Sequence, residues 1–366
     1  MTAVAVNRRR SLLLAQARAQ PQSRPSPAAA GPHAVREVRA FQVAASQTNS
    51  AYVVLQIRTA SGLTGYGECR TLTSPELKAT ADAVTGRAAS SYEVLDPLVP
   101  PAVRGALNMA LLDTLGKATN APVYRLLGGP TRNKARAITR LQGDSDAQLV
   151  DNLKKQFAAG YRAFLLPIPV PSARNQGSDY IRAAVSRFEG MRAAEPTADL
   201  ALQCCAELSA GDAAALATAL EKLHPLWFDE PCAVSNIASL HKISDETVVP
   251  LGFGRGIADG GVYQQLLREG VIDLLRLDVH THGITGMRKL AALAETYYVD
   301  VAPWHEGGPI ANAAALHAAG CIPNFYIAQL TNPAPNSVRD GYFTLSAAPG
   351  LGVDVDERQL EKGQIA

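Results

Sequence analysis

Five short segments of this 366-residue chain end in side chains that can bind ions or move protons. The segments close with Gln203-Cys204-Cys205, Asp229-Glu230-Pro231, Gly254-Arg255, Asp278-Val279-His280 and Trp304-His305-Glu306. The spacing is regular, because 26 residues separate Gln203 from Asp229 and another 26 separate Asp229 from Arg255. Each group follows a short apolar run, so carboxylates, imidazoles and a guanidinium are expected at successive strand ends.

Repeated strand-length apolar segments indicate the architecture that positions these groups. They lie at about 135–141, 161–166, 199–204, 225–228, 248–252, 272–277, 299–303 and 324–330. Most of the intervals between them hold a helical pattern, as at 213–223 and 287–294. Eight strands alternating with helices predict a (β/α)8 barrel, whose functional groups stand at the C-terminal ends of the strands. An open, doubly wound sheet is the alternative, and it is disfavoured because no glycine-rich phosphate turn follows the first strand.

The first third of the chain has a different rhythm, with strands first and helices after them. We expect strands at 35–41 and 51–57, a hairpin through 64–68 and a helix over 102–118. This order indicates an α+β unit. Residues 1–31 contain Arg8-Arg9-Arg10 before a short apolar patch, which is similar to a twin-arginine export signal. The patch is shorter than the ~7–15 residues of such a signal, so a disordered extension and a cytoplasmic protein are expected, with export left open.

Composition excludes several classes of function. Lys and Arg number 35 against 33 Asp and Glu, a formal charge of +2, which argues against a nucleic-acid partner and a polybasic membrane patch. No apolar run approaches the ~18 residues of a membrane span. The five cysteines form no CxxC pair, so neither a disulfide scaffold nor a thiolate zinc site is expected.

Several motifs, taken in order, resemble the enolase superfamily and, within it, the mandelate racemase and muconate lactonizing enzyme-like sugar-acid dehydratases and racemases. The most specific are Gly65-Tyr66-Gly67-Glu68, Leu111-Leu112-Asp113-Thr114-Leu115-Gly116-Lys117, Trp227-Phe228-Asp229-Glu230-Pro231, Gly283-Ile284-Thr285 and Pro349-Gly350-Leu351-Gly352-Val353. The resemblance covers nearly all of the chain after residue 33. It implies an enolase-like α+β capping domain at 32–131, a modified (β/α)8 barrel at 132–343 and a C-terminal segment at 344–366 that returns to the cap. It also implies a small-molecule carboxylate as partner and a homo-oligomer.

The resemblance implies a magnesium site that this sequence does not fill. Three carboxylates on successive strand ends hold Mg²⁺ in such proteins, where the ion stabilises an enediolate. The matching positions here are Gln203, Asp229 and Arg255, so Asp229 is the only retained ligand position. We therefore expect no metal cofactor, although relatives use Mg²⁺.

The acid/base groups are also altered. The positions of a Lys-x-Lys pair fall on Leu165 and Pro167, and the position of a hydrogen-bonding glutamate falls on Gln329. Asp278 matches the aspartate of a His–Asp dyad, and His305 follows it at the family's interval of 27 residues. Matching the flanking residues 301–303, however, puts Trp304 on the histidine position and His305 one later.

The loss of two metal-ligand positions and of both lysines disfavours an Mg²⁺-dependent dehydratase or racemase. Two other hypotheses remain open. The first is an enzyme of lyase or isomerase type that acts without metal, with His305 oriented by Asp278 as the catalytic pair. Its substrate-binding residues would be Arg255, which would hold a carboxylate at two points, with Gln203, Gln329, Asp229, Glu306 and Trp304. The second is a non-catalytic homologue that binds or scaffolds, in which Asp229 and Arg255 form a structural ion pair and Trp304 fills part of the pocket.

Overall fold

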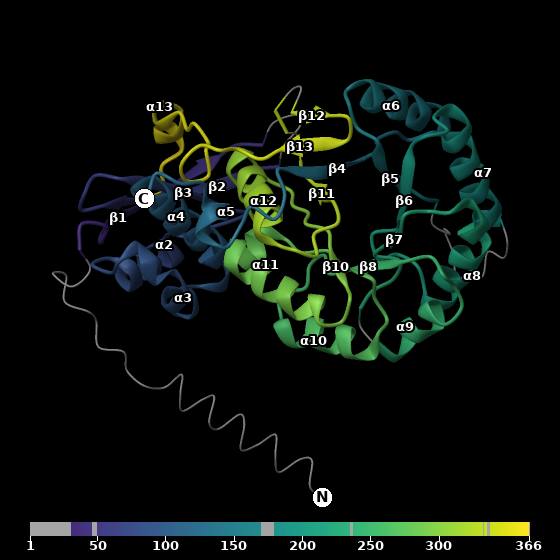
Figure 1. Ribbon diagram of the computed structural model, residues 1–366, viewed down its shortest axis with the longest axis horizontal. Coiled ribbons are helices and arrows are strands. Elements are labelled where there is room, and N and C mark those ends of the chain that lie inside the picture. The colour runs from purple at the N-terminus through teal and green to yellow at the C-terminus, as the bar shows by residue number, and fades with distance from the viewer. Residues whose placement is uncertain are drawn as a thin grey trace, which may run out of the picture.

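A three-stranded antiparallel sheet with its helices, and a closed barrel of parallel strands, make up the described part of the chain (Figure 1). The computed structural model describes residues 31–45, 50–169, 179–234, 237–331, 333–334 and 337–365. The expected disordered extension at 1–31 lies outside these residues, except for Gly31.

The antiparallel sheet has the order β1-β2-β3, from strands β1 (Val35–Val43), β2 (Tyr52–Thr59) and β3 (Thr64–Cys69), which confirms the expected strands and hairpin. Its helices are α2 (Ser74–Val84), α3 (Tyr92–Leu95), α4 (Pro101–Ala118) and α5 (Val123–Leu126). Helix α4 packs on β3 so closely that a Cβ at Gly67 would lie 1.8 Å from the carbonyl oxygen of Ala106. The two glycines of the Gly65-Tyr66-Gly67-Glu68 motif are therefore required by this close approach.

Eight parallel strands form the barrel and confirm the predicted fold class. They are β4 (Lys134–Arg140), β5 (Ala163–Pro167), β6 (Asp199–Gln203), β7 (Phe228–Asp229), β8 (Leu251–Phe253), β9 (Leu274–Leu275), β10 (Asp300–Val301) and β11 (Ala328–Gln329). Each pairs in parallel with the next from β4 to β10, and β11 pairs with β4. Parallel bridges from Val301 to Phe325 and from Trp304 to Gln329 close the ring.

In the part of the chain that the structure describes, seven α-helices lie outside these strands, and Figure 1 shows them around the ring. They are α6 (Asp146–Ala158), α7 (Asp179–Ala194), α8 (Ala210–Leu220), α9 (Ile237–Ser244), α10 (Gly260–Glu269), α11 (Val279–Glu295) and α12 (Pro309–Cys321). After β11 the described chain forms a hairpin, β12 (Val338–Arg339) and β13 (Tyr342–Thr344), instead of an eighth helix. Strand β13 pairs antiparallel with β4, so the barrel is a modified one. The boundary between residues 131 and 132 stays a prediction.

The barrel is filled by side chains, not hollow. One apolar cluster contains an inward-facing residue from most of the strands, and its members are Ile138, Ala163, Leu165, Ala201, Trp227, Leu274, Ala302 and Ile327. Side chains alternate along a strand, so residues two positions further on face the same interior, one layer nearer the C-terminal mouth. This places Gln203, Asp229, Arg276, Trp304 and Gln329 in the layer above the apolar cluster.

The sheet and helices of the first third are joined to the barrel by buried polar contacts. Glu68 at the end of β3 is fully buried, and its carboxylate accepts hydrogen bonds from the backbone N–H groups of Gly308 (2.6 Å) and Ala311 (3.2 Å) at the start of α12. It also lies 3.0 Å from Nε2 of His280. A helix N-terminus favours such an anion. Glu68 therefore fixes the N-terminal unit over the mouth of the barrel.

The C-terminal segment is tied to the N-terminal unit through Asp113 of α4. One carboxylate oxygen of Asp113 accepts the Leu351 N–H (2.8 Å), and the other accepts the Tyr66 N–H (3.0 Å) and pairs with Lys117 (2.7 Å). Further along, Glu357 in α13 (Glu357–Leu360) pairs with Arg58 of β2. None of the described helices is long and apolar enough to cross a membrane.

Replacing Asp113 tests this connection. Asp113→Ala removes the acceptor of two buried backbone N–H groups, so we expect the free energy of unfolding to fall by about 2–4 kcal/mol. Urea unfolding followed by circular dichroism measures the loss. Asp151→Ala, on the exposed surface of α6, is the control and should change stability by less than about 0.5 kcal/mol. Equal stability of the two variants would contradict the role given to Asp113.

Candidate functional site

Polar side chains meet at the C-terminal mouth of the barrel, in the layer above the apolar cluster. Strand register aligns Gln203 with Asp229, and parallel bridges align Trp304 with both Asp278 and Gln329. The strand ends therefore bring together most of the residues that the sequence predicted. Trp304, and not His305, is in register with Asp278.

Asp229 is the centre of this layer and is completely buried. Its Oδ2 lies 2.9 Å from Nη2 of Arg255, which is the ion pair expected from the sequence. Its Oδ1 lies 2.6 Å from Nε of Arg276 and accepts a hydrogen bond from Nε1 of Trp227 at 2.9 Å. Each oxygen of the carboxylate is thus in contact with a guanidinium.

Arg276 is the main member of the site that the sequence analysis missed. It is completely buried, and its guanidinium donates to the Ala302 carbonyl (2.8 Å) and to Oε1 of Gln329 (2.5 Å). Burial lowers its pKa to about 10, against the opposing effect of Asp229, so the side chain stays cationic at neutral pH. A sequence signal was present: Arg276 precedes Asp278 by two residues, so alternation places it inside the barrel as well.

Arg255 is held on three sides. Its Nη2 contacts Asp229 and donates to Oε1 of Gln329 at 2.5 Å, and its Cζ lies 4.4 Å from the ring centroid of Trp304. The side chain keeps 15% of its surface exposed, and among the described residues its Nε and Nη1 make no hydrogen bond. Since Nη2 already contacts Asp229 and Gln329, Nη1 is the group left to bind a carboxylate, and the two-point grip stays a prediction.

These residues do not fit a magnesium ion. Mg²⁺ requires several oxygen ligands at about 2.1 Å, and carboxylates are its usual protein ligands. Here the single carboxylate is neutralised by two guanidinium groups, and Gln203 beside it is uncharged. No group of three or more His, Cys, Asp and Glu side chains is placed to hold a metal ion in the parts of the chain that the structure describes.

Glu230, next to Asp229, is buried in a strained turn with a φ of 47°. Its Oε1 accepts the N–H groups of Gly254 (2.7 Å) and Arg255 (2.6 Å). Burial, followed by the charge of Asp229, raises its pKa to about 7. Glu230 thus fixes the backbone that carries Arg255, and its charge changes near neutral pH.

The structure does not pair His305 with Asp278 as the sequence predicted. His305 is fully buried, and its Nε2 lies 2.7 Å from Oδ1 of Asn312, while Nδ1 has no partner among the described residues. Burial, followed by the charge of His280, lowers the pKa of His305 to about 4. Side chains alternate, so with Trp304 facing the mouth, the next residue turns toward α12. The prediction that Asp278 orients His305 is therefore wrong.

Asp278 instead belongs to the contact between the mouth and the N-terminal unit. It caps α11, accepting the His280 N–H and the Thr281 hydroxyl at 3.0 Å each. Its Oδ2 lies 3.1 Å from Nη2 of Arg70, which follows β3 and was missed by the sequence analysis. The Cζ of Arg70 is 5.5 Å from the Trp304 ring centroid, so Trp304 is contacted by an arginine from each unit. No motif in the sequence marks Arg70.

The remaining predicted site residues differ in how far they can meet a ligand. Gln203 is buried, and its Oε1 has no hydrogen-bond partner among the described residues. Gln329 is occupied by the two arginines. Glu306 is exposed in the loop between β10 and α12. Leu165 belongs to the apolar cluster and cannot move protons.

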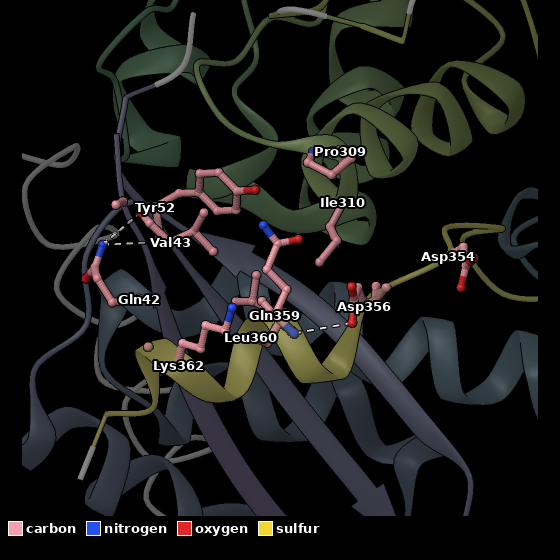
Figure 2. A pocket seen from close by; sticks show the side chains of 14 residues that line it. Gln42, Val43, Tyr52, Pro309, Ile310, Asp354, Asp356, Gln359, Leu360 and Lys362 are labelled. Carbon is pink, nitrogen blue, oxygen red and sulfur yellow. Dashed lines mark hydrogen bonds between the residues drawn. The ribbon is translucent and has the colours of Figure 1, made fainter. Parts of the chain in front are cut away.

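A separate cavity of about 490 Å³ lies away from this layer, between the N-terminal sheet, α12 and the C-terminal segment. Figure 2 shows Gln359 and Leu360 of α13 facing Pro309 and Ile310 of α12, with Tyr52 at one side. Gln42 in its wall donates to the carbonyls of Val43 and Tyr52. None of the residues around Asp229 lines this cavity.

Two family models match the chain. The N-terminal domain of mandelate racemase / muconate lactonizing enzyme matches residues 32–128, and the enolase C-terminal domain-like model matches residues 148–359. Together they cover the sheet unit and the barrel apart from its first strand, β4, and the start of α6.

Characterised relatives and solved structures agree with these matches. A D-galactonate dehydratase of Ralstonia pickettii (strain 12J) is 29% identical over 342 residues, covering 84% of this chain and 89% of that protein. A second, from Ralstonia nicotianae (strain ATCC BAA-1114 / GMI1000), is 31% identical over 279 residues, covering 71% and 73%. The crystal structure of a mandelate racemase/muconate lactonizing enzyme-like protein from Roseovarius sp. TM1035 superposes with a TM-score of 0.81 at 25% identity, covering 90% and 95%.

The raised pKa of Glu230 gives a testable pH dependence. The folded state holds its proton up to about pH 7, whereas the unfolded chain releases it near its ordinary value of 4.5. The contribution of Glu230 to stability is therefore largest below pH 4.5 and is lost as the pH rises to about 7, by about 3 kcal/mol. Unfolding free energies of the wild type minus those of Glu230→Gln, measured from pH 4.5 to 8, should fall by this amount. The lowered pKa of His305 makes stability rise with pH in both proteins, so this contribution cancels when the two unfolding free energies are subtracted. A difference that does not change with pH would contradict the raised pKa of Glu230.

Proposed function

Because the chain belongs to the mandelate racemase/muconate lactonizing enzyme group of the enolase superfamily, we propose that it binds a small hydroxy or sugar acid at the barrel mouth without magnesium. Arg255 takes the carboxylate of that acid through Nη1. The observation that carries the proposal is the Asp229 carboxylate in contact with two guanidinium groups.

Charge supports an anionic ligand. Arg255 and Arg276 share one carboxylate, Asp229, so this layer has one positive charge in excess while Glu230 is protonated. Part of that charge is accessible, since the Arg255 side chain is 15% exposed and Nη1 is free of partners among the described residues. A hydrogen bond from a guanidinium to a carboxylate is about twice as strong as one between neutral groups.

A hydroxyl on the ligand is supported by Gln203. Its buried Oε1 lacks a donor among the described residues, and an unpaired buried acceptor costs about 1–3 kcal/mol. A hydroxyl next to the carboxylate would supply that donor. The similarity to D-galactonate dehydratases supports a polyhydroxy acid as the ligand class.

Binding without turnover is the function that the geometry favours. Leu165 and Pro167 stand where relatives would carry bases, Trp304 fills the position of the dyad histidine, and His305 is buried against Asn312. The second candidate is lyase-type acid/base turnover of the same acid, and the similarity to dehydratases favours it.

Ligand binding can be tested with a panel of hydroxy and sugar acids, including D-galactonate, by thermal shift and calorimetry in EDTA. We expect at least one acid to bind, and Arg255→Ala to weaken its binding by about 10- to 100-fold, the loss of one charged hydrogen bond. Asp229 keeps Arg276 as partner in this variant, so the fold should survive. Arg268→Ala, on the exposed face of α10, is the control. Binding that needs magnesium, or that is the same in both variants, would contradict the proposal.

Turnover is distinguished from binding by proton exchange. The acid that binds is incubated with the protein in D₂O, and its α-proton is followed by NMR. Binding without turnover predicts an undiminished α-proton signal and no new product over many hours. Exchange or dehydration would establish the second candidate instead.

A further inference from the structure

The guanidinium of Arg276 occupies a site built from cation-binding groups. Three oxygens surround it: Oδ1 of Asp229 at 2.6 Å from Nε, Oε1 of Gln329 at 2.5 Å from Nη2, and the Ala302 carbonyl at 2.8 Å from Nη1. Its Cζ lies 5.5 Å from the ring centroid of Trp227. A carboxylate, an amide oxygen, a carbonyl oxygen and an indole face are all groups that bind cations.

This cation cannot leave its site without disturbing the barrel. Arg276 has no exposed surface, and Trp304 donates from Nε1 to its carbonyl at 3.2 Å. The end of β8 approaches it so closely that a Cβ at Gly254 would lie 2.8 Å from the Arg276 oxygen, and Gly254 has a φ of +141°. The surroundings of Arg276 are thus fitted to a permanently placed guanidinium.

We propose that Arg276 is an internal cation standing in place of a divalent metal, and that it excludes a metal from Asp229 independently of the carboxylates missing at positions 203 and 255. Restoring those two carboxylates alone does not create a metal site. This inference does not rest on the proposed acid ligand, because it concerns only which cation Asp229 can hold.

The contacts of Asp229 explain why two changes are not enough. Replacing Arg255 frees only Oδ2, because Oδ1 remains with Arg276 and with Nε1 of Trp227. A metal ion on Oδ2 would then lie within a few ångströms of a buried guanidinium. Repulsion between like charges is strong there, since the interior screens charge far less than water does.

The experiment compares variants that differ only at residue 276. The first is Gln203→Asp/Arg255→Glu, which supplies three carboxylates and retains Arg276. The second adds Arg276→Met. Mn²⁺ is the probe, because the electron paramagnetic resonance signal of the free ion reports how much is bound. We expect the wild type and the double variant to leave the ion free, and the triple variant to bind it at least about tenfold more tightly than the double variant.

Folding is controlled by a second pair of triple variants. Arg276→Gln, added to the same two changes, retains a donor for Ala302 and should also bind Mn²⁺, with a rise in melting temperature on adding the ion. Arg276→Lys retains the charge and should not bind it. Binding of Mn²⁺ by the double variant would overturn the proposal. The proposal would also be overturned if the Arg276→Lys triple variant bound Mn²⁺ as tightly as the Arg276→Gln triple variant. It would be overturned as well if the Arg276→Met and Arg276→Gln triple variants were folded but did not bind Mn²⁺.

Discussion

The structure of the barrel mouth depends on one buried carboxylate, Asp229, each of whose oxygens contacts an arginine. Asp229 has no exposed surface, and an uncompensated charge at such a depth would cost several kcal/mol. Arg276, which follows β9, and Arg255, which follows β8, compensate the charge of Asp229. Both also donate hydrogen bonds to Oε1 of Gln329. Trp227 and Trp304 pack against the two guanidinium groups. The same arrangement occupies both oxygens of Asp229 with guanidinium groups and leaves a positive charge facing the mouth, which is the basis of our proposal that Asp229 holds no metal ion.

The N-terminal unit completes this site through a second pair of charges. Glu68 binds the start of α12, and Arg70, two residues later, reaches Asp278 and the ring of Trp304. Asp278 therefore serves the contact between the two units and the cap of α11, and not a histidine. Asp278 lies where the family resemblance implies the aspartate of a His–Asp dyad, but its partners in this structure are Arg70 and the first residues of α11.

Most of the fold could be predicted from the sequence, because apolar periodicity and family motifs both reflect packing. Eight strands, the β1–β3 sheet and α4 were expected close to where they lie. Charge partners were harder to predict. The Asp229–Arg255 pair follows from strand order, but Arg276 was hidden inside an apolar run, where only alternation identifies it as inward-facing. His305 was misplaced, because a one-residue offset at an irregular strand end reverses the side-chain direction. Arg70 joins Asp278 across 208 positions of sequence, which no local pattern encodes.

The most direct test of this account is a crystal structure of the wild-type protein soaked in Mn²⁺, with anomalous diffraction used to locate the ion. The account predicts no anomalous peak within about 2.5 Å of the Asp229 oxygens, and density for the Arg276 guanidinium against Oδ1. A Mn²⁺ ion coordinated by Asp229, with Arg276 displaced from the barrel interior, would contradict it.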